Sequence, residues 1–386
     1  EIELVGDDLR ELVASFRITP APRDPTPYRA KFKLLAEHVC DSCRQALAGG
    51  LLAVSHRPGL AEMEGVTIVA GYQDHPPEVG DDKVLVYGNC AYRYRHLGHY
   101  EPGCPPLAYQ VGKGLAELKT RTIRPAMCSI AWRNEPIERV APLIAAAGYP
   151  GIEAWGPHLD RYVREHGALA PLAQQFRDLG LQTPMISAYF DLVNNLEASL
   201  ETARRYLGYA ADLGAPLIRV FTGGGDSAKS SIATWRSVTA GLKQICQMAA
   251  PAHVDLALET HSGHLHDTTD STLRLIRQVA EPNLGVNLDI FNLFERGEDP
   301  LRALKCLLPY MRIVHLKNGI WDGARWQYGQ PLSAGAMDYV AFLRALDECN
   351  YGGFVSIEWF GADPQGAASG ELSYLRQQLG RKLEGR

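Results

Sequence analysis

The stretch VDLALETHSGHLHD, residues 254–267, passes from an apolar run into a dense group of polar side chains. Its first five residues are mostly apolar and have the length of a buried strand. Glu259 follows them with no turn between, and three histidines come within the next seven residues. An ionised carboxylate at the end of a buried strand is costly when it stands alone. The stretch therefore predicts a strand that runs out of a protein core into a functional site.

Seven more short apolar segments accompany this strand, and helix-like patterns with apolar residues at intervals of three and four separate them. The eight predicted strands are residues 126–132, 151–155, 184–190, 216–221, 254–259, 284–289, 312–317 and 354–359. Eight strand–helix units over about 260 residues predict a (β/α)₈ barrel. An open doubly wound sheet would more often show about five or six strands and a glycine-rich fingerprint after the first strand.

A basic, proline-containing segment at residues 117–127 marks a predicted domain boundary. We expect a smaller α/β domain of unassigned role over residues 1–120 and the barrel over 121–386. In the smaller domain, helices are predicted at residues 28–50 and 107–118, and strands at 65–71 and 83–90.

Composition and charge limit the classes of partner. The net charge of −5 argues against nucleic acid or an anionic membrane surface. No apolar run approaches the ~20 residues that span a bilayer, and the chain starts without a signal-like segment. Eight cysteines in 386 residues do not indicate a disulfide scaffold. We therefore expect a cytoplasmic protein that acts on a small molecule, with no nucleic-acid or membrane partner; a homo-oligomer is compatible with the sequence.

Four neighbouring predicted strands carry a metal-ligating side chain at or near their carboxyl ends, where barrel active sites lie. The residues are Glu259, Asp289, His315 and Glu358, and they lie 30, 26 and 43 positions apart. Three crowded carboxylates repel one another, and a divalent cation relieves that repulsion. Oxygen donors with one imidazole suit Mn²⁺, Mg²⁺, Co²⁺ or Zn²⁺, and the absence of thiolate argues against a structural zinc site.

Residues from about 125 to 380 resemble the xylose isomerase-like barrel superfamily of sugar isomerases, epimerases and related dehydratases. The motifs that carry the resemblance are GIEAW (151–155), LGAPLIRVFTGG (213–224), LALETHSG (256–263), VNLDIFN (286–292), IVHLKN (313–318) and NYGGFVSIEW (350–359). The resemblance implies that the same strand-end Glu, Asp, His and Glu hold one divalent metal ion.

Further side chains are candidates for proton transfer and substrate binding. The resemblance implies the role of general base for His261, and a substrate hydrogen bond is the alternative. Lys317 lies two residues beyond His315, so on a strand both share a face; it is expected to act as an electrophile or to pair with a carboxylate. Glu259 and Glu358 are also expected to take part in catalysis. Candidate substrate-binding residues are His158, Arg219, His264, Asn292 and Trp359. Of His264 and His266, one is expected to face substrate and the other water.

Two positions depart from the pattern of the superfamily's epimerases. Those enzymes carry a second glutamate six residues past the first ligand, where this chain has Leu265. They also tend to carry a histidine three residues past the aspartate ligand, where this chain has Asn292. The first departure argues against an epimerisation that uses two glutamates.

The function expected from these observations is a divalent-metal-dependent isomerase or epimerase of a sugar, polyol or keto-sugar, acting through enediolate proton transfer. The alternative is a dehydratase or lyase of a keto-polyol or dehydroshikimate-like substrate, with His261 as base. A third hypothesis is an abasic-site endonuclease-like phosphodiesterase, which the net charge and Asn292 disfavour. A fourth is a barrel that binds a ligand without catalysis.

The first third of the chain holds four cysteines, Cys40, Cys43, Cys90 and Cys104. A C-x-x-C pair with two more cysteines is compatible with a four-thiolate zinc or iron–sulfur site. Cys40 and Cys43 also fall on the apolar stripe of the predicted helix, where a buried cysteine behaves as a small hydrophobic residue. The sequence favours this second interpretation.

Overall fold

The structure, a computed structural model, describes residues 32–55, 63, 65–79, 83–118, 122–349, 351–380 and 383. It divides into two compact units, Glu1–Thr120 and Arg121–Arg386. The first residues of the helix predicted at 28–50 lie outside the described residues. Among the described residues, every helix is too short or too polar to cross a bilayer.

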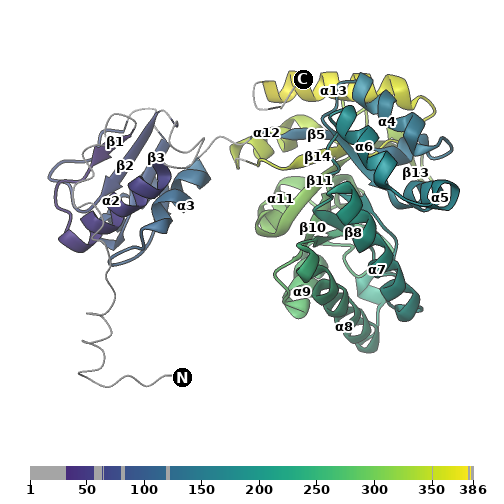
Figure 1. Ribbon diagram of the computed structural model, residues 1–386, viewed down its shortest axis with the longest axis horizontal. Coiled ribbons are helices and arrows are strands. Elements are labelled where there is room, and N and C mark those ends of the chain that lie inside the picture. Colours follow the sequence, from purple (N-terminus) through teal and green to yellow (C-terminus); the bar gives the residue numbers. More distant parts are fainter. Residues whose placement is uncertain are drawn as a thin grey trace. The chain divides into compact units, whose positions relative to one another are not determined.

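The larger unit is a closed barrel of eight parallel strands surrounded by helices, which confirms the predicted fold (Figure 1). The barrel strands, in chain order, are β5 (Arg124–Cys128), β6 (Gly151–Trp155), β7 (Ile186–Ser187), β8 (Leu217–Val220), β9 (Asp255–Glu259), β10 (Leu284–Asp289), β11 (Met311–Leu316) and β14 (Phe354–Ile357). The barrel closes because β14 pairs with β5. An antiparallel hairpin, β12 (Asn318–Trp321) and β13 (Trp326–Gln330), follows β11.

Apolar faces of the surrounding helices pack against the strands and form one large core. The helices are α4 (Ile137–Ala146), α5 (Gly156–His166), α6 (Ala170–Asp178), α7 (Leu196–Leu213), α8 (Ile232–Ala249), α9 (Thr269–Val279), α10 (Ile290–Phe294), α11 (Pro300–Leu307), α12 (Tyr339–Glu348) and α13 (Pro364–Leu379). Local chemistry fixes several helix ends. The Asn195 side chain accepts a hydrogen bond from Ala198 N at the start of α7, and Gly214 ends that helix in the left-handed conformation.

Strand register brings the carboxyl ends of β9, β10, β11 and β14 to one level. Glu259 is the lateral partner of Asn287. Two residues further along β10, Asp289 is the partner of His315. His315 is in turn the partner of Ser356, two residues before Glu358. The parallel pairing therefore delivers the four predicted metal ligands to the same end of the barrel.

The smaller unit is a four-stranded parallel sheet with α-helices on one face and a 3₁₀ segment on the other. Its elements are β1 (Lys33–Leu35), α2 (Asp41–Ser55), β2 (Val66–Ala70), β3 (Lys83–Tyr87), the 3₁₀ segment η2 (Asn89–Leu97), β4 (His99–Glu101) and α3 (Tyr109–Leu118). The strands lie in the order β1-β2-β3-β4. Ile68 and Leu85 pack with Leu47 of α2 on one face, while Val69 packs with Tyr94 of η2 on the other. Successive side chains of β2 point to opposite faces of the sheet, so the strand contributes to a small core on each face.

The helix predicted at residues 28–50 is wrong over its first described part. Residues Lys33–Leu35 form β1, which pairs with β2, and the helix α2 begins only at Asp41. Over so short a segment, the apolar residues fit the period of a helix as well as that of a strand. Residues 33–35 form a strand because they pair with β2. Cys40 therefore lies before the helix and is exposed, whereas Cys43 is buried beside Leu47.

One buried carboxyl should make barrel stability depend on pH. Burial raises the pKa of Glu371 in α13 to about 7, although Leu332 N donates a hydrogen bond to its carboxylate. Because the folded-state pKa is raised, this group stabilises the fold below about pH 4.5, and the stabilisation is lost as pH rises through about 7. Glu371→Gln, which keeps an acceptor but no charge, should raise the free energy of unfolding by about 1–3 kcal/mol at pH 8. Thermal melts should show little gain at pH 4; an equal gain at both pH values would contradict this prediction.

Candidate metal and active site

The four predicted ligands converge at the carboxyl end of the barrel. Glu259 and Asp289 end β9 and β10, His315 lies near the end of β11, and Glu358 directly follows β14. Each offers one ligand atom, and these atoms all lie within 4.8 Å of one another. All four side chains are buried, so a cation among them would be shielded from bulk water.

Cationic side chains of the same chain face these carboxylates. Arg219 Nη1 donates to Glu259 Oε2 at 2.9 Å. Lys317 Nζ lies 2.8 Å from Asp289 Oδ2 and donates to Glu358 Oε2 at 3.1 Å. Lys317 was expected either to act as an electrophile or to pair with a carboxylate, and it makes the carboxylate pairing. Burial alone would lower the pKa of Lys317, but Asp289 and Glu358 hold it above its usual range.

The ring of His315 is held by a glutamate that sequence reasoning missed. Glu153 Oε2 accepts a hydrogen bond from His315 Nε2 at 2.8 Å, and the Ser187 hydroxyl also donates to Glu153. Burial alone would lower the pKa of His315, but Glu153 and Glu259 raise it to about 9. Conversely, burial alone would raise the pKa of Glu153, and His315 holds it below its usual range. The sequence signal that could have identified Glu153 is a glutamate in the middle of an otherwise apolar strand, GIEAW.

The donor set fits a divalent cation. His315 Nδ1 is buried, has no hydrogen-bond partner, and lies 3.6 Å from Glu259 Oε2. A buried nitrogen without a partner is costly unless something occupies the space it faces. Three carboxylates and one imidazole are hard or borderline donors, as expected for Mn²⁺, Mg²⁺, Co²⁺ or Zn²⁺. Hydrogen bonding of Nε2 to Glu153 leaves Nδ1 as the ligand atom, the usual carboxylate–histidine arrangement of metal sites.

Three aromatic rings, those of Phe221, His264 and His266, stack on one another beside the cluster. His264 stacks on Phe221 at 4.5 Å and on His266 at 5.3 Å, each time nearly parallel. His266 is fully buried and does not face water, whereas His264 is half-buried and partly exposed; its role toward substrate stays a prediction. Burial lowers the pKa of His264 to about 4 and that of His266 to about 3, which leaves both rings neutral at pH 7.

His261 has a geometry suited to accepting a proton. Its Nδ1 lies 2.5 Å from the Ser262 carbonyl oxygen, which can only accept, so Nδ1 carries the hydrogen. In the neutral ring, Nε2 therefore holds the basic lone pair. The half-buried ring stands edge-on to Phe221, with 5.1 Å between the ring centres.

A glycine run holds the histidine loop in place. Gly223, Gly224 and Gly225 all have positive φ, which side chains with a Cβ rarely adopt. This turn allows Gly225 N to donate to Gly263 O at 3.0 Å. Gly263 N in turn donates to Asp226 Oδ1 at 2.8 Å. The loop after β8 and the loop after β9 are thereby tied together around the stacked rings.

Arg219 is the predicted substrate-binding residue that the structure places in direct contact with the cluster. Its guanidinium lies 4.7 Å from the ring of Tyr189 and 4.4 Å from that of Phe221. Nε and Nη2 are buried without hydrogen-bond partners. Arg219 therefore retains N–H groups for an oxygen-rich ligand after it has paired with Glu259.

Three other predicted substrate-binding residues make contacts within the protein. His158 lies 3.1 Å from Ser129 Oγ through Nδ1, and Asn292 Nδ2 donates to Thr260 O at 2.9 Å. Both side chains are buried. The hydrogen bond of Asn292 to Thr260, the residue after β9, holds the end of that strand. Trp359, next to Glu358, is buried, and its Nε1 has no partner.

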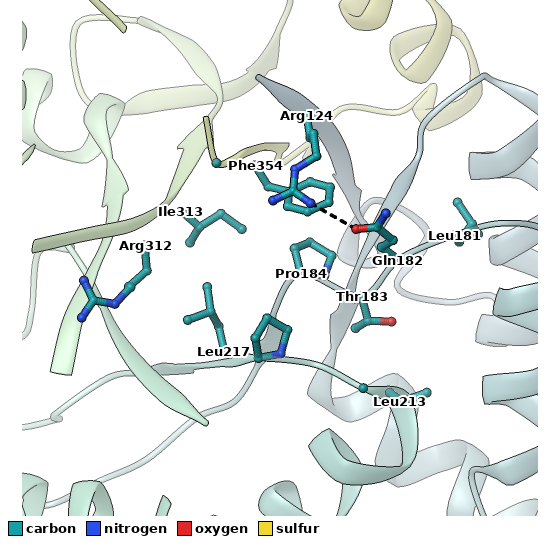
Figure 2. Close-up of a pocket in the computed structure, with 13 residues that line it drawn as sticks. Arg124, Leu181, Gln182, Thr183, Pro184, Leu213, Leu217, Arg312, Ile313 and Phe354 are labelled. Atoms are coloured by element: carbon teal, nitrogen blue, oxygen red, sulfur yellow. Dashed lines mark hydrogen bonds between the residues drawn. The ribbon is translucent and has the colours of Figure 1, made fainter. Parts of the chain in front are cut away.

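A separate hollow of about 430 Å³ opens at the opposite, amino end of the strands (Figure 2). Arg124 and Phe354, the first residues of β5 and β14, line it. Figure 2 shows the Arg124 guanidinium beside the Phe354 ring, 4.1 Å from its centre, and hydrogen-bonded to Gln182. Its lining has no carboxylate or imidazole, and barrel active sites lie at the other end. We therefore place the candidate active site at the carboxylate cluster.

Comparisons with known proteins match the barrel part of the chain. The family model described as "Xylose isomerase-like TIM barrel" matches residues 141–378. The 3-dehydroshikimate dehydratase of Bacillus anthracis is 28% identical over 269 residues, which cover 65% of this chain and 95% of that protein. The inosose dehydratase of Clostridium beijerinckii is 22% identical over 284 residues, 62% of this chain and 91% of that protein.

Solved structures show the same barrel. The probable 3-DHS dehydratase AsbF from Bacillus anthracis aligns with a TM-score of 0.60 and 27% identity, over 66% of this chain and 98% of that one. The IOLI protein, crystallised with a zinc atom, aligns with a TM-score of 0.59 and 20% identity, over 68% of this chain and 100% of that one. The second likeness shows the fold alone.

Metal binding should release a proton from His315. With a pKa of about 9 in the metal-free chain, His315 is protonated at pH 7 and must lose a proton to offer Nδ1. The apparent affinity for Mn²⁺ should therefore rise by up to about tenfold per pH unit between pH 7 and 9. In the metal-free chain, the protonated ring stabilises the fold below about pH 6.5, and this stabilisation is lost as pH rises through about 9. Calorimetry in two buffers of different ionisation enthalpy measures the released proton, and identical enthalpies in both would refute the assignment.

Glu153→Gln should weaken metal binding without removing a ligand. The variant replaces the carboxylate that fixes His315 by a neutral amide, so Mn²⁺ affinity should fall about 10- to 100-fold. The pKa of His315 should also fall, which would shift the pH dependence of binding to lower pH. Glu138→Gln, a substitution of a half-buried glutamate in α4, is the matched control. Loss of thermal stability with an unchanged pH profile would indicate that Glu153 serves only the fold.

Proposed function

This chain belongs to the xylose isomerase-like TIM barrel family, and on that premise we propose that it is a divalent-metal-dependent dehydratase of a cyclic keto-polyol or dehydroshikimate-like keto acid. The observation that carries the proposal is the convergence of Glu259, Asp289, His315 and Glu358 within 4.8 Å. His261, with a free basic nitrogen, lies two residues past the first of them.

The dehydratase alternative has more support than the isomerase or epimerase first expected. Both curated relatives described above are dehydratases, one of 3-dehydroshikimate and one of inosose. Leu265, fully buried, stands where the resemblance places the second glutamate of an epimerase. Without that second carboxylate, His261 is the main candidate for a base that is not also a proposed metal ligand.

In this proposal Glu259, Asp289, His315 and Glu358 hold the cation. A divalent cation bound there would polarise a substrate carbonyl and make the neighbouring C–H bond more acidic. Lys317, between Asp289 and Glu358, places a further positive charge at the same point. Negative charge that develops on a substrate oxygen would be stabilised by this charge in a site shielded from water.

Proton transfer falls to His261. Its Nε2 accepts the proton from the carbon beside the carbonyl, and the electron pair of that C–H bond becomes available for a new C=C bond. The C–O bond to the β-hydroxyl then breaks, and the leaving oxygen takes the proton back from His261 as water departs. The ring returns to its neutral state, so a single base serves both transfers.

Substrate recognition is assigned to the groups around this base. Arg219 offers Nε and Nη2 to a carboxylate or hydroxyl oxygen. His264, neutral at pH 7, suits a hydroxyl better than an anion. Trp359 supplies an apolar wall next to Glu358, as one face of a six-membered ring requires. A charged, planar guanidinium beside neutral imidazoles fits a substrate with one acidic group and several hydroxyls.

Turnover on a defined panel tests the proposal. The full chain is incubated with 3-dehydroshikimate, an inosose and a ketose, each with Mn²⁺, Mg²⁺, Co²⁺ or Zn²⁺, and mass spectrometry detects a product lighter by one water. His261→Ala should lower kcat by about 10²- to 10⁴-fold while metal content is retained. Glu259→Gln should lose both metal and activity. His166→Ala, an exposed histidine in α5, is the matched control and should behave as wild type.

Other outcomes distinguish the rival functions. Deuterium incorporation from heavy water without loss of water would indicate an isomerase or epimerase. Metal binding with no turnover of any compound on the panel would favour a ligand-binding barrel. Retention of metal and activity in Glu259→Gln would overturn the proposed site itself.

A further inference from the structure

Three exposed cysteines in the smaller unit are unusual. Cys40, Cys90 and Cys104 are exposed and unpaired, although free cysteine is among the most buried residue types. The cysteines of the barrel show the usual tendency of cysteine to be buried: Cys128 and Cys246 are buried, and the other two are half-buried. The exposed thiols therefore call for an explanation other than packing.

Topology places these cysteines at one edge of the sheet. The four strands are parallel, so their carboxyl ends lie along the same edge. Cys40 and Cys43 follow β1, Cys90 follows β3, and Cys104 follows β4. The last two segments are joined directly, since Asn89 N donates to Gly103 O at 2.8 Å. Cysteines up to 64 positions apart in sequence thus lie along the same edge of the sheet.

Electrostatic interactions between the thiols support this gathering. Burial, and after it the nearby Cys40, Cys90 and Cys104, together raise the pKa of the Cys43 thiol to about 12. Hydrogen bonds from Cys43 lower the pKa of Cys40. Cys43 is therefore a neighbour of all three other thiols. The burial of Cys43 beside Leu47 anchors one member of the group in the core, while the other three face outward.

We propose that Cys40, Cys43, Cys90 and Cys104 form a thiolate site for a thiophilic metal centre, either one zinc ion or an iron–sulfur cluster. Four cysteines are the usual complement of both. The C-x-x-C pair at the start of α2 supplies two ligands from one turn, and each of the two other loops supplies one. A bound cation would lower the cost of ionising the buried Cys43 thiol. The proposal does not depend on the function of the barrel.

Metal analysis of the full chain tests this site. The protein is purified without oxygen in an Asp289→Asn background, so that the barrel cluster is impaired as a metal site. Zinc, iron and acid-labile sulfide are then measured per chain, with the visible spectrum. One zinc without sulfide, or iron and sulfide in equal amounts with visible absorption, supports the site and distinguishes its two forms. Metal-free protein is also titrated with Co²⁺ alone, because thiolate ligands give a charge-transfer absorption that carboxylates and imidazole do not.

Matched cysteine variants decide the outcome. Cys90→Ser and Cys104→Ser, both exposed positions, should fold normally by circular dichroism and lose most of the metal and the Co²⁺–thiolate absorption. Cys306→Ser, a half-buried barrel cysteine, should retain both. The proposal is overturned if Cys90→Ser keeps full metal content, or if wild type shows neither metal nor the Co²⁺–thiolate absorption. A Cys40–Cys43 disulfide in metal-free protein purified without oxygen would likewise overturn it.

Discussion

Repulsion among three buried carboxylates is the constraint on which the barrel site depends. Glu259, Asp289 and Glu358 are almost fully shielded from water, and their ligand atoms lie within 4.8 Å of one another. Like charges this close repel far more strongly in the protein interior than at its surface. Such a group can persist only with positive charge of comparable size beside it. In the chain alone that charge comes from Arg219 and Lys317, together with protonated His315.

This balance makes metal binding an exchange of charge. When His315 gives up its proton, the cluster loses one positive charge. A divalent cation would add two, so the net charge of the cluster would rise by one. Glu153 accepts from Nε2, so it would keep the ring oriented with and without a cation bound at Nδ1. The site can therefore keep its shape without the ion, and binding does not require the barrel end to fold around it.

The barrel and the convergence of four donor side chains at one end of it were predictable from sequence because they follow from strong, short-range patterns. Most strands are apolar runs of ordinary length, although β7 has only two residues, and each of the last four carries one donor side chain at or near its carboxyl end. The pairing of Glu153 with His315 was not predictable in this way, since the two residues lie 162 positions apart. Nothing in GIEAW shows which side chain its glutamate meets. The stacking of His264 on Phe221 depends likewise on a contact between two loops.

The smaller unit shows the same limit in its local structure. Residues 33–35 fit a helical period as well as a strand, and only the pairing of Lys33 with Thr67 removes the ambiguity. That single change moves Cys40 from the side of a helix to the loop after a strand. Parallel strands deliver whatever follows them to one edge, and this rule gathers carboxylates in the barrel and cysteines in the sheet. An interpretation based on helical period hides the second case because it assigns Cys40 and Cys43 to one buried stripe. Strand pairing instead leaves Cys40 exposed after β1, at the edge of the sheet that Cys90 and Cys104 also follow.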